Sequence, residues 1–225
     1  MTLDEATRRL AAANVENPRA EARLLLAHVL GVSREATLAA TPTPDQAAKF
    51  DAAVARRAAR EPFAYITGRK QFWSLDFAVG PGVLVPRPDT ETLIGEALRV
   101  VPDRAARLTI ADLGTGSGAI LVAALREFPN ASGIGFESSP QAHGVAAANA
   151  ARHVPGRAEI RLADWNTAAG PYDLVFSNPP YIPSADIESL APDVRAHEPH
   201  AALDGGPDGL AAYRALARLL PPILA

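Results

Sequence analysis

Four consecutive residues, Asn178, Pro179, Pro180 and Tyr181, combine side chains that could bind a flat nitrogen group. An asparagine amide offers a hydrogen-bond donor and an acceptor side by side, the pair that a planar amide or an aromatic amino group requires. Proline fixes the backbone and has no N–H group of its own, and the tyrosine ring could lie against a flat substrate. This order of residues predicts a clamp for a planar nitrogen rather than an ordinary proline-rich loop.

A glycine-rich stretch is the second candidate site. It consists of Asp112, Leu113, Gly114, Thr115, Gly116, Ser117 and Gly118. Glycines let a ligand approach the backbone closely, and the helix expected to follow would present unpaired N–H groups. The stretch indicates a nucleotide-type cofactor, but it also fits a tight strand-to-helix turn. With Ala119 it matches a dinucleotide fingerprint as well, so the glycines alone do not choose the cofactor.

Acidic side chains follow three successive strands that the sequence predicts. Asp112 ends the first, Glu137 follows the second, and Asp164 follows the third with Trp165 beside it. The carboxyl ends of parallel strands share one edge of a sheet, where ligands bind. There Glu137 could accept both ribose hydroxyls, Asp164 could meet an adenine amino group, and the indole could cover the ring. Singly, these residues also fit a helix cap, a solvated acid and a core indole; together they favour a nucleotide-type site.

Strands and helices alternate from residue 108 onward, which predicts a parallel sheet covered by helices. Apolar runs predict strands at 108–112, 132–136, 158–162 and 172–177. Helical patterns fall at 118–128, 140–151 and 208–220. Asn178 would close the fourth strand at the edge where the acidic residues lie.

The first 60 residues predict a small bundle of three helices. Capping boxes open the first and third, formed by Thr2 with Glu5 and by Thr43 with Gln46. Asn17-Pro18 predicts a cap and the first residue of the middle helix. The three helices are expected to end near residues 15, 31 and 61.

A segment of mixed character joins the bundle to the predicted sheet. Residues 71–73 and 75–79 predict a hairpin, and 81–88 is punctuated by Pro and Gly. Asp89 or Thr90 could cap the helix that follows. We therefore expect an α/β fold whose parts are a helical domain, a hairpin and linker, and a sheet domain, at residues 1–62, 63–88 and 89–225.

The composition is that of a globular protein, with 225 residues, 48% hydrophobic and 21% charged. The net charge of −3 argues against broad binding to nucleic acid, and the lack of cysteine excludes disulfides and thiolate sites. The histidines are not spaced as a metal site. A soluble cytoplasmic protein without a membrane span is expected. One basic stretch fits either a solvated face or a docking surface, and it comprises Arg56, Arg57, Arg60, Arg69 and Lys70.

Taken together, the glycine stretch and the tetrad 178–181 resemble class I S-adenosylmethionine-dependent N-methyltransferases, whose catalytic domain is Rossmann-like. Residues 60–68 and 85–91 look like the hinge and the Pro-Arg-Pro motif of a narrower group. That group is the PrmC/HemK family of protein-glutamine N5-methyltransferases, which modify peptide chain release factors. Glu198-Pro199 and the segment 203–210 also resemble it, so the likeness spans nearly the whole chain.

The resemblance implies roles for individual residues. The methyl donor S-adenosylmethionine, which leaves as S-adenosylhomocysteine, would contact the glycine stretch, Glu137, Trp165 and Asn178. The tetrad 178–181 would hold the glutamine of the Gly-Gly-Gln motif of class 1 release factors. Asn178 and the Pro179 carbonyl would accept both N–H bonds of that side-chain amide. A monomer that does not bind DNA directly and needs no metal is expected.

Two departures from the family pattern are visible. Glu137 stands where the family usually has aspartate, so its ribose contact must fit one more methylene. The family also continues beyond position 225 into the last three strands of its sheet. The sheet of this chain is therefore expected to lack one side, and the chain to be less stable than a form extended through those strands.

Three other functions fit parts of the sequence. An adenine-N6 DNA methyltransferase shares the tetrad, but it usually carries a basic DNA-reading segment, and none is visible here. A nicotinamide-linked dehydrogenase would leave the tetrad unexplained. A binding module that kept the fold and lost activity is the third alternative.

Overall fold

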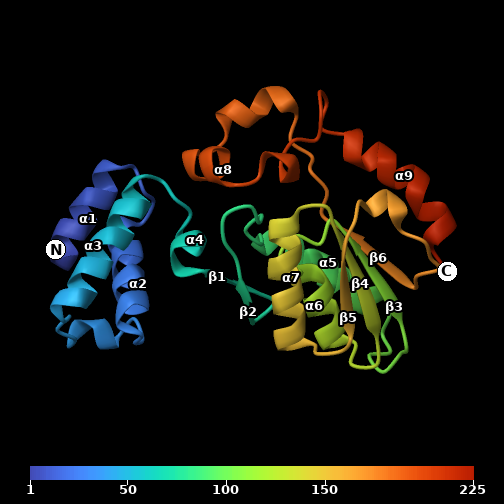
Figure 1. Cartoon of the computed structure of the whole chain (residues 1–225), viewed down its shortest axis with the longest axis horizontal. Coiled ribbons are helices and arrows are strands. Elements are labelled where there is room, and N and C mark those ends of the chain that lie inside the picture. The colour runs from blue at the N-terminus through green and yellow to red at the C-terminus, as the bar shows by residue number, and fades with distance from the viewer. The chain divides into compact units, whose positions relative to one another are not determined.

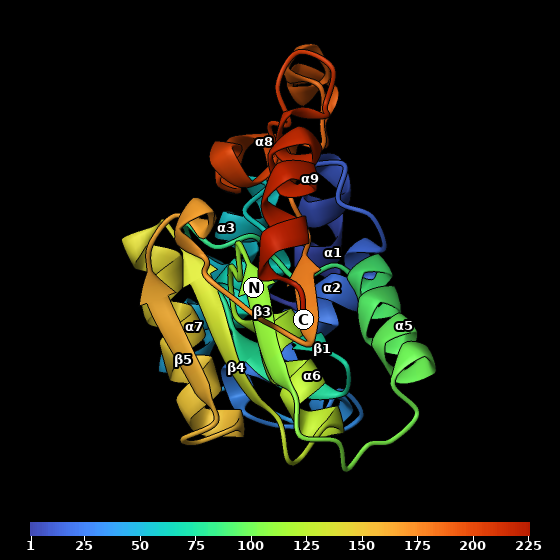
Figure 2. The same cartoon turned by 90° about the vertical axis from the view of Figure 1, so that its right-hand side faces the viewer.

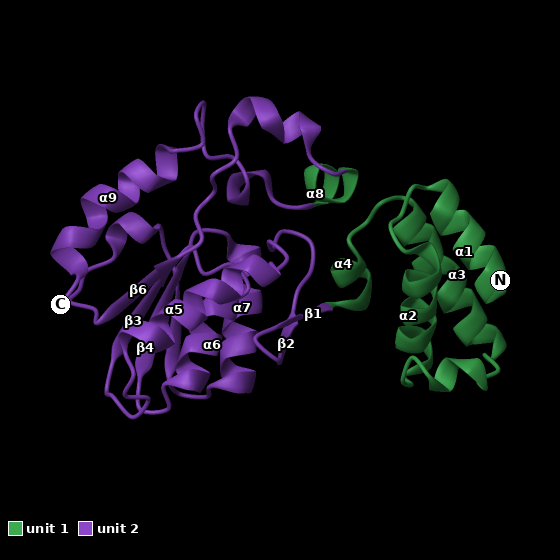
Figure 3. Cartoon of the chain, turned by 180° about the vertical axis from the view of Figure 1, so that it is seen from behind, with its two compact units in different colours: residues 1–68, 192–197 green, residues 69–191, 198–225 purple.

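The computed structural model describes residues 1–225, which form two compact units (Figure 3). Unit 1 comprises residues 1–68 and 192–197, and unit 2 comprises residues 69–191 and 198–225. Each unit has its own hydrophobic core. None of the helices has the length and apolar character needed to cross a bilayer.

Unit 1 is helical. Its helices are α1 (Leu3–Ala12), α2 (Pro18–Leu30), α3 (Pro44–Ala58), α4 (Phe63–Thr67) and α8 (Pro192–His197). Leu10, Leu25 and Phe50 meet in its core, and each is at most 2% exposed. The helical bundle predicted from the sequence is thus confirmed, although α1 and α3 each end about three residues earlier than expected.

The predicted helix starts are confirmed except for one cap. Both capping boxes form, so Thr2 and Thr43 accept bonds from the backbone N–H groups of Glu5 and Gln46. Asn17 was expected to cap α2, but its backbone is left-handed (φ 50°) and its side chain makes no capping bond. Asparagine tolerates this conformation better than most residues, so the helix starts at Pro18 without a side-chain cap.

Arginines at the end of α3 are neutralised within unit 1. Arg57 is 5% exposed and lies 2.5 Å from Glu21 and 3.3 Å from Asp193. Arg60 lies 2.7 Å from the same Asp193, and Arg56 pairs with Glu61. A solvated face is therefore the wrong interpretation for Arg57. The pairs of Arg57 and Arg60 with Asp193 attach the short helix α8 to the helical bundle.

Unit 2 begins with the expected hairpin. Strand β1 (Arg69–Phe72) pairs antiparallel with β2 (Leu75–Ala78), and Phe72 lies opposite Leu75. The turn residues Trp73 and Ser74 have positive φ angles of 48° and 60°, as in a type I′ turn, so the predicted place of Trp73 in the first strand is wrong. A 3₁₀ turn (Pro88–Glu91) leads into α5 (Thr92–Val100), and no side chain caps it. The expected cap by Asp89 or Thr90 is therefore wrong.

A four-stranded sheet forms the centre of unit 2 (Figure 1). The strands lie in the order β5-β4-β3-β6, and all neighbouring pairs are parallel. Their bounds are β3 (Thr109–Leu113), β4 (Ser132–Glu137), β5 (Ala158–Leu162) and β6 (Leu174–Ser177). All four predicted strands are present, with ends within two residues of their predicted positions.

Helices cover both faces of this sheet (Figure 2). They are α6 (Ala119–Glu127), α7 (Pro140–His153) and α9 (Ala211–Ile223). Ile110 of β3 packs in one cluster with α5, α6 and the hairpin, while Ala111 and Leu113 pack in a second cluster with α9. Successive side chains of a strand point to opposite faces, so β3 is apolar on both sides. This explains why apolar residues occupy successive positions of β3, at Ile110 and Ala111.

Candidate active site

Strand register brings the predicted site residues to one edge of the sheet. Leu113, the last residue of β3, pairs with Phe136 of β4 and with Ser177 of β6. The next residue on each of the three strands is therefore Gly114, Glu137 and Asn178, respectively. Because the strands are parallel, these residues lie at the same carboxyl edge.

The glycine turn is fastened to the end of β4. The backbone N–H groups of Gly114 and Thr115 both donate to the carbonyl of Phe136, at 3.0 Å each. Gly118 follows with φ 80° and caps α6; a Cβ added there would touch Ala146 of α7 at 3.4 Å. A left-handed residue in contact with a neighbouring helix requires glycine. The turn is therefore restrained at its start by β4 and at its end by α7.

Asp112 supports this turn from below. Its side chain is fully buried, and its Oδ2 accepts a 2.6 Å hydrogen bond from the Thr115 hydroxyl. Its Oδ1 is buried without a hydrogen-bond partner. Burial raises the pKa of Asp112 to about 7, and the nearby charge of Glu137 adds to the rise. The hydrogen bond from Thr115 acts in the opposite direction and lowers this pKa.

Glu137 is held by two backbone donors. Its Oε2 accepts from the Gly116 N–H at 2.9 Å, and its Oε1 accepts from the Ser139 N–H at 2.8 Å. Each carboxylate oxygen has a further lone pair available. The additional methylene relative to aspartate therefore leaves the carboxylate fixed between the glycine turn and the start of α7, with acceptor capacity to spare.

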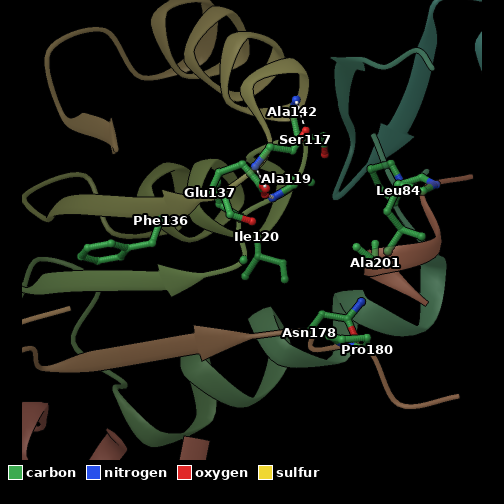
Figure 4. A pocket seen from close by; sticks show the side chains of 18 of the residues that line it. Leu84, Ser117, Ala119, Ile120, Phe136, Glu137, Ala142, Asn178, Pro180 and Ala201 are labelled. Carbon is green, nitrogen blue, oxygen red and sulfur yellow. Dashed lines mark hydrogen bonds between the residues drawn. The ribbon is translucent and has the colours of Figure 1, made fainter. Parts of the chain in front are cut away.

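A cavity of about 300 Å³ lies over this edge of the sheet, within the size range of small-molecule sites. Figure 4 shows Glu137 and Asn178 on the side of the sheet, with Leu84 and Ala201 opposite them. The predicted site residues that line it are Gly114, Thr115, Gly116, Ser117, Glu137, Asp164, Trp165, Asn178 and Pro180. The structure thus brings together most of the predicted set in one place.

Four predicted site residues lie outside the lining of this cavity. Asp112 lies in β3, below the glycine turn, and Gly118 ends the turn at the start of α6. Pro179 is buried, whereas the side chain of Tyr181 is 55% exposed at the surface. The tetrad therefore faces two ways, with Asn178 and Pro180 toward the cavity and Tyr181 toward solvent.

Asp164 and Trp165 form one wall at the end of β5. The Asp164 carboxylate accepts a 2.8 Å bond from the Asn166 N–H and caps a short 3₁₀ turn that begins with Trp165. The indole lies so near the glycine turn that a Cβ on Gly114 would contact it at 3.5 Å. A Cβ at this distance would make an ordinary contact with the ring, so the feature that favours glycine at 114 is its positive φ of 76°.

Asn178 is fixed by a residue from another part of the chain. Its Nδ2 donates to the Thr90 hydroxyl at 3.3 Å. With the amino group turned to Thr90, the Oδ1 atom points away from it and is available as an acceptor. Thr90 also lines the cavity. It was expected only as a helix cap, and its site role was missed.

The segments around residues 84–90 and 198–202 form the opposite wall, which the sequence did not predict. Glu198, whose side chain is 2% exposed, accepts from the Val85 N–H at 3.1 Å and pairs with Arg87 at 2.7 Å. Arg87 and Pro199 line the cavity. Both segments carry motifs of the resembled family, and this likeness was the only signal that could have pointed to them.

The residues that line the cavity offer polar and apolar groups that could bind an organic ligand. No group of three or more His, Asp or Glu side chains could hold a metal ion. The lining offers backbone N–H groups, two carboxylates held by backbone N–H groups, an indole and an oriented amide. This set suits a nucleoside-type cofactor next to a planar nitrogen group.

Family models match both parts of the chain. Residues 2–68 match the PrmC N-terminal domain, and residues 93–194 match the methyltransferase small domain. The second match covers the glycine turn, the acids after the strands and the tetrad.

Curated relatives match almost the whole chain. A release factor glutamine methyltransferase of Rhodospirillum rubrum is 50% identical over 228 residues, which cover 99% of this chain and 70% of that protein. Its counterpart in Caulobacter vibrioides is 45% identical over 225 residues, which cover 95% of this chain and 77% of that protein.

Among solved structures, the hMettl16 catalytic domain in complex with the MAT2A 3′UTR hairpin 6 is similar with a TM-score of 0.55. The similarity covers 81% of this chain and 66% of that one, at 13% sequence identity. At this identity the likeness concerns the fold alone.

Proposed function

The chain belongs to the family of release factor glutamine methyltransferases, and from this premise we propose that it methylates the side-chain amide nitrogen (N5) of a release-factor glutamine. The methyl donor is S-adenosyl-L-methionine. The observation that carries the proposal is that the glycine turn, Glu137 and Asn178 line a single cavity. The glutamine is that of the Gly-Gly-Gln motif of class 1 release factors.

The donor's nucleoside part fits the wall built by the glycine turn, Glu137 and Trp165. The turn offers backbone N–H groups near a helix start, and the Glu137 carboxylate has lone pairs left for two ribose hydroxyls. The indole covers the adenine ring, with Asp164 beside its amino group. When bound, S-adenosyl-L-methionine supplies an activated methyl group and leaves as S-adenosyl-L-homocysteine.

Asn178 prepares the substrate nitrogen. An amide nitrogen is a poor nucleophile because its lone pair is delocalised into the carbonyl. The Oδ1 of Asn178, oriented by the bond from its Nδ2 to Thr90, and the carbonyl of Pro179 accept the two N–H groups. This arrangement favours a pyramidal nitrogen whose lone pair is free to attack the methyl carbon.

The same two bonds contribute to catalysis because they strengthen along the reaction. Positive charge builds on the nitrogen as the new bond forms, so acceptors fixed beforehand stabilise the transition state more than the bound substrate. The methylated nitrogen is strongly acidic, so one of its protons leaves without a dedicated base. Pro180, which lines the cavity, packs against the flat amide, whereas Tyr181 faces solvent in this structure.

We extend the proposal to the organisation and surroundings of the protein. Residues 1–62 recognise the release factor, and residues 89–225 catalyse the methyl transfer. Residues 63–88 connect these two parts. The protein acts in the cytoplasm as a monomer and does not bind DNA. The basis is the family membership together with the separate compact core of the helical unit.

Mass spectrometry tests the proposal directly. The chain is incubated with S-adenosyl-L-methionine and a class 1 release factor, and in parallel with duplex DNA. One added methyl group on the glutamine of Gly-Gly-Gln is expected, with unmodified DNA. A methylated adenine with an unmodified release factor would reject the proposed substrate, while transfer to neither would reject the activity.

A further inference from the structure

One loop of unit 2 lies directly behind the tetrad 178–181 and has no role in the account above. We call residues 203–210 the backing loop. Its backbone pairs with the residue that follows the tetrad: the Ile182 N–H donates to the Leu203 carbonyl at 3.1 Å, and the Gly205 N–H donates to the Ile182 carbonyl at 2.8 Å. The backing loop thus forms a short parallel pairing, between Asp204 and Ile182, directly after the tetrad.

A second set of bonds extends this pairing by two residues. The Ser184 N–H donates to the Gly206 carbonyl at 3.0 Å, and the Ser184 hydroxyl donates to Asp204 Oδ1 at 2.7 Å. The Gly206 N–H donates to the same Asp204 oxygen at 2.9 Å. The Ser184 hydroxyl and the Gly206 amide hold the pKa of Asp204 below its ordinary value, so this acceptor is ionised at neutral pH.

Two buried glycines of the backing loop leave no space against Tyr181. A Cβ on Gly205 would lie 2.7 Å from Tyr181 Cα, and a Cβ on Gly209 would lie 2.4 Å from the Tyr181 carbonyl oxygen. Both contacts are with backbone atoms, which cannot rotate away as a side chain could. Gly209 also has φ 73°, a conformation that L side chains rarely adopt.

We propose that Gly205 and Gly209 are positioning residues for methyl transfer: they let the backing loop press against the backbone of Tyr181 and so fix the tetrad relative to the cavity. The inference rests on the proposed function, because it assigns these glycines to the same reaction. Neither touches the cavity, and no residue from 203 to 210 lines it. Their effect is therefore transmitted through the tetrad.

The expected size of the effect follows from the geometry. An ordinary contact lies at 3.4 Å or more, so a methyl group at Gly209 must displace the Tyr181 carbonyl, or be displaced itself, by about 1 Å. Misplacement of a catalytic group by this distance can reduce the rate about 10²-fold. The prolines before Tyr181 leave the backbone few ways to absorb the shift locally.

The test compares Gly209→Ala with Gly156→Ala. Gly156 has the same φ of 73° and nothing within 4 Å of its added Cβ, so this control carries the backbone strain without the contact. Gly209→Ala is expected to lower kcat for the release factor about 10²-fold, with unchanged Kd for S-adenosyl-L-methionine. Gly156→Ala is expected to leave kcat unchanged.

Hydrogen exchange provides a readout independent of turnover. Gly209→Ala should speed exchange at the Ile182 and Ser184 amides, while exchange in the strands of the sheet stays as in the wild type. Should Gly209→Ala fail to fold, Ser184→Ala removes one side-chain bond without strain. Its kcat should fall about threefold to tenfold, as expected for a lost hydrogen bond.

Different outcomes separate the inference from the proposed function. Unchanged kcat in Gly209→Ala, or an equal loss of kcat in Gly156→Ala, would overturn the positioning role. If Gly209→Ala does not fold, unchanged kcat in Ser184→Ala would overturn it instead. A parallel loss of cofactor affinity would also overturn it. A wild-type protein inactive on release factors would reject the proposed function, and unchanged exchange at Ile182 would then reject the backing-loop contact by itself.

Discussion

Replacement of Asp112 by asparagine is expected to change how the stability of the protein depends on pH. The native pKa of about 7 lies above the ordinary value of 3.8 because the carboxyl group is fully buried. The native chain therefore keeps its proton at pH values where the unfolded chain has lost it. By linkage, this group favours the native state at low pH, and that contribution is lost as pH rises from about 4 to 7.

The magnitude follows from the two pKa values. Their difference corresponds to about 4 kcal/mol of unfolding free energy over the whole range. Roughly 2.5 kcal/mol of this loss falls between pH 5 and pH 8. Asparagine has nearly the same shape, can still accept from the Thr115 hydroxyl, and does not titrate. Relative to the Asp112→Asn variant, the wild type should thus lose about 2.5 kcal/mol between these pH values.

Urea denaturation of both proteins at pH 5 and pH 8 measures this difference. Comparison with the variant removes the contribution of every other titratable group, because the two proteins share all of them. Asp173→Asn is a suitable control because bonds from Thr109 lower the pKa of Asp173; that carboxyl is ionised in both states at both pH values. If the stability difference between the wild type and the Asp112→Asn variant is the same at both pH values, the reasoning is refuted.

Two further substitutions test the walls of the cavity. Glu137→Ala should weaken S-adenosyl-L-methionine binding by removing bonds from a charged acceptor, each worth about 1.5–3 kcal/mol; calorimetry that finds unchanged affinity would show that the ribose assignment is wrong. Glu198→Gln should lower the unfolding free energy by roughly 2 kcal/mol in denaturation experiments, because it removes the charge of a buried carboxylate that pairs with Arg87. The loss is moderate because Arg87 itself is only partly buried. Equal midpoints for the two proteins would mean that this ion pair does not hold the wall.

Local patterns in the sequence were sufficient to predict the sheet and the residues on one side of the site. Periodic apolar runs define strands and helices, and the carboxyl ends of parallel strands must share an edge. For this reason Gly114, Glu137 and Asn178 could be expected together from the sequence alone. The capping boxes at Thr2 and Thr43 were visible for a similar reason, since they depend on residues three positions apart.

Contacts between distant segments could not be predicted in this way. The partner of Asn178 is Thr90, 88 residues away, and the partner of the Val85 amide is Glu198, 113 residues away. Periodicity contains no information about such pairs. Arg57 shows the same limit, because its burial depends on acids from two other helices of unit 1.

The role of Asn178 as an acceptor for the substrate amide is the central claim, and the turnover of two variants measures it most directly. Asn178→Ala removes the oriented Oδ1, and Asn178→Asp keeps the acceptor but adds charge and loses the donor to Thr90. Methylation of the release factor, followed by mass spectrometry at saturating S-adenosyl-L-methionine, should fall by ~10²–10³ in kcat for Asn178→Ala, with unchanged folding. Near-wild-type turnover by Asn178→Ala would contradict the account.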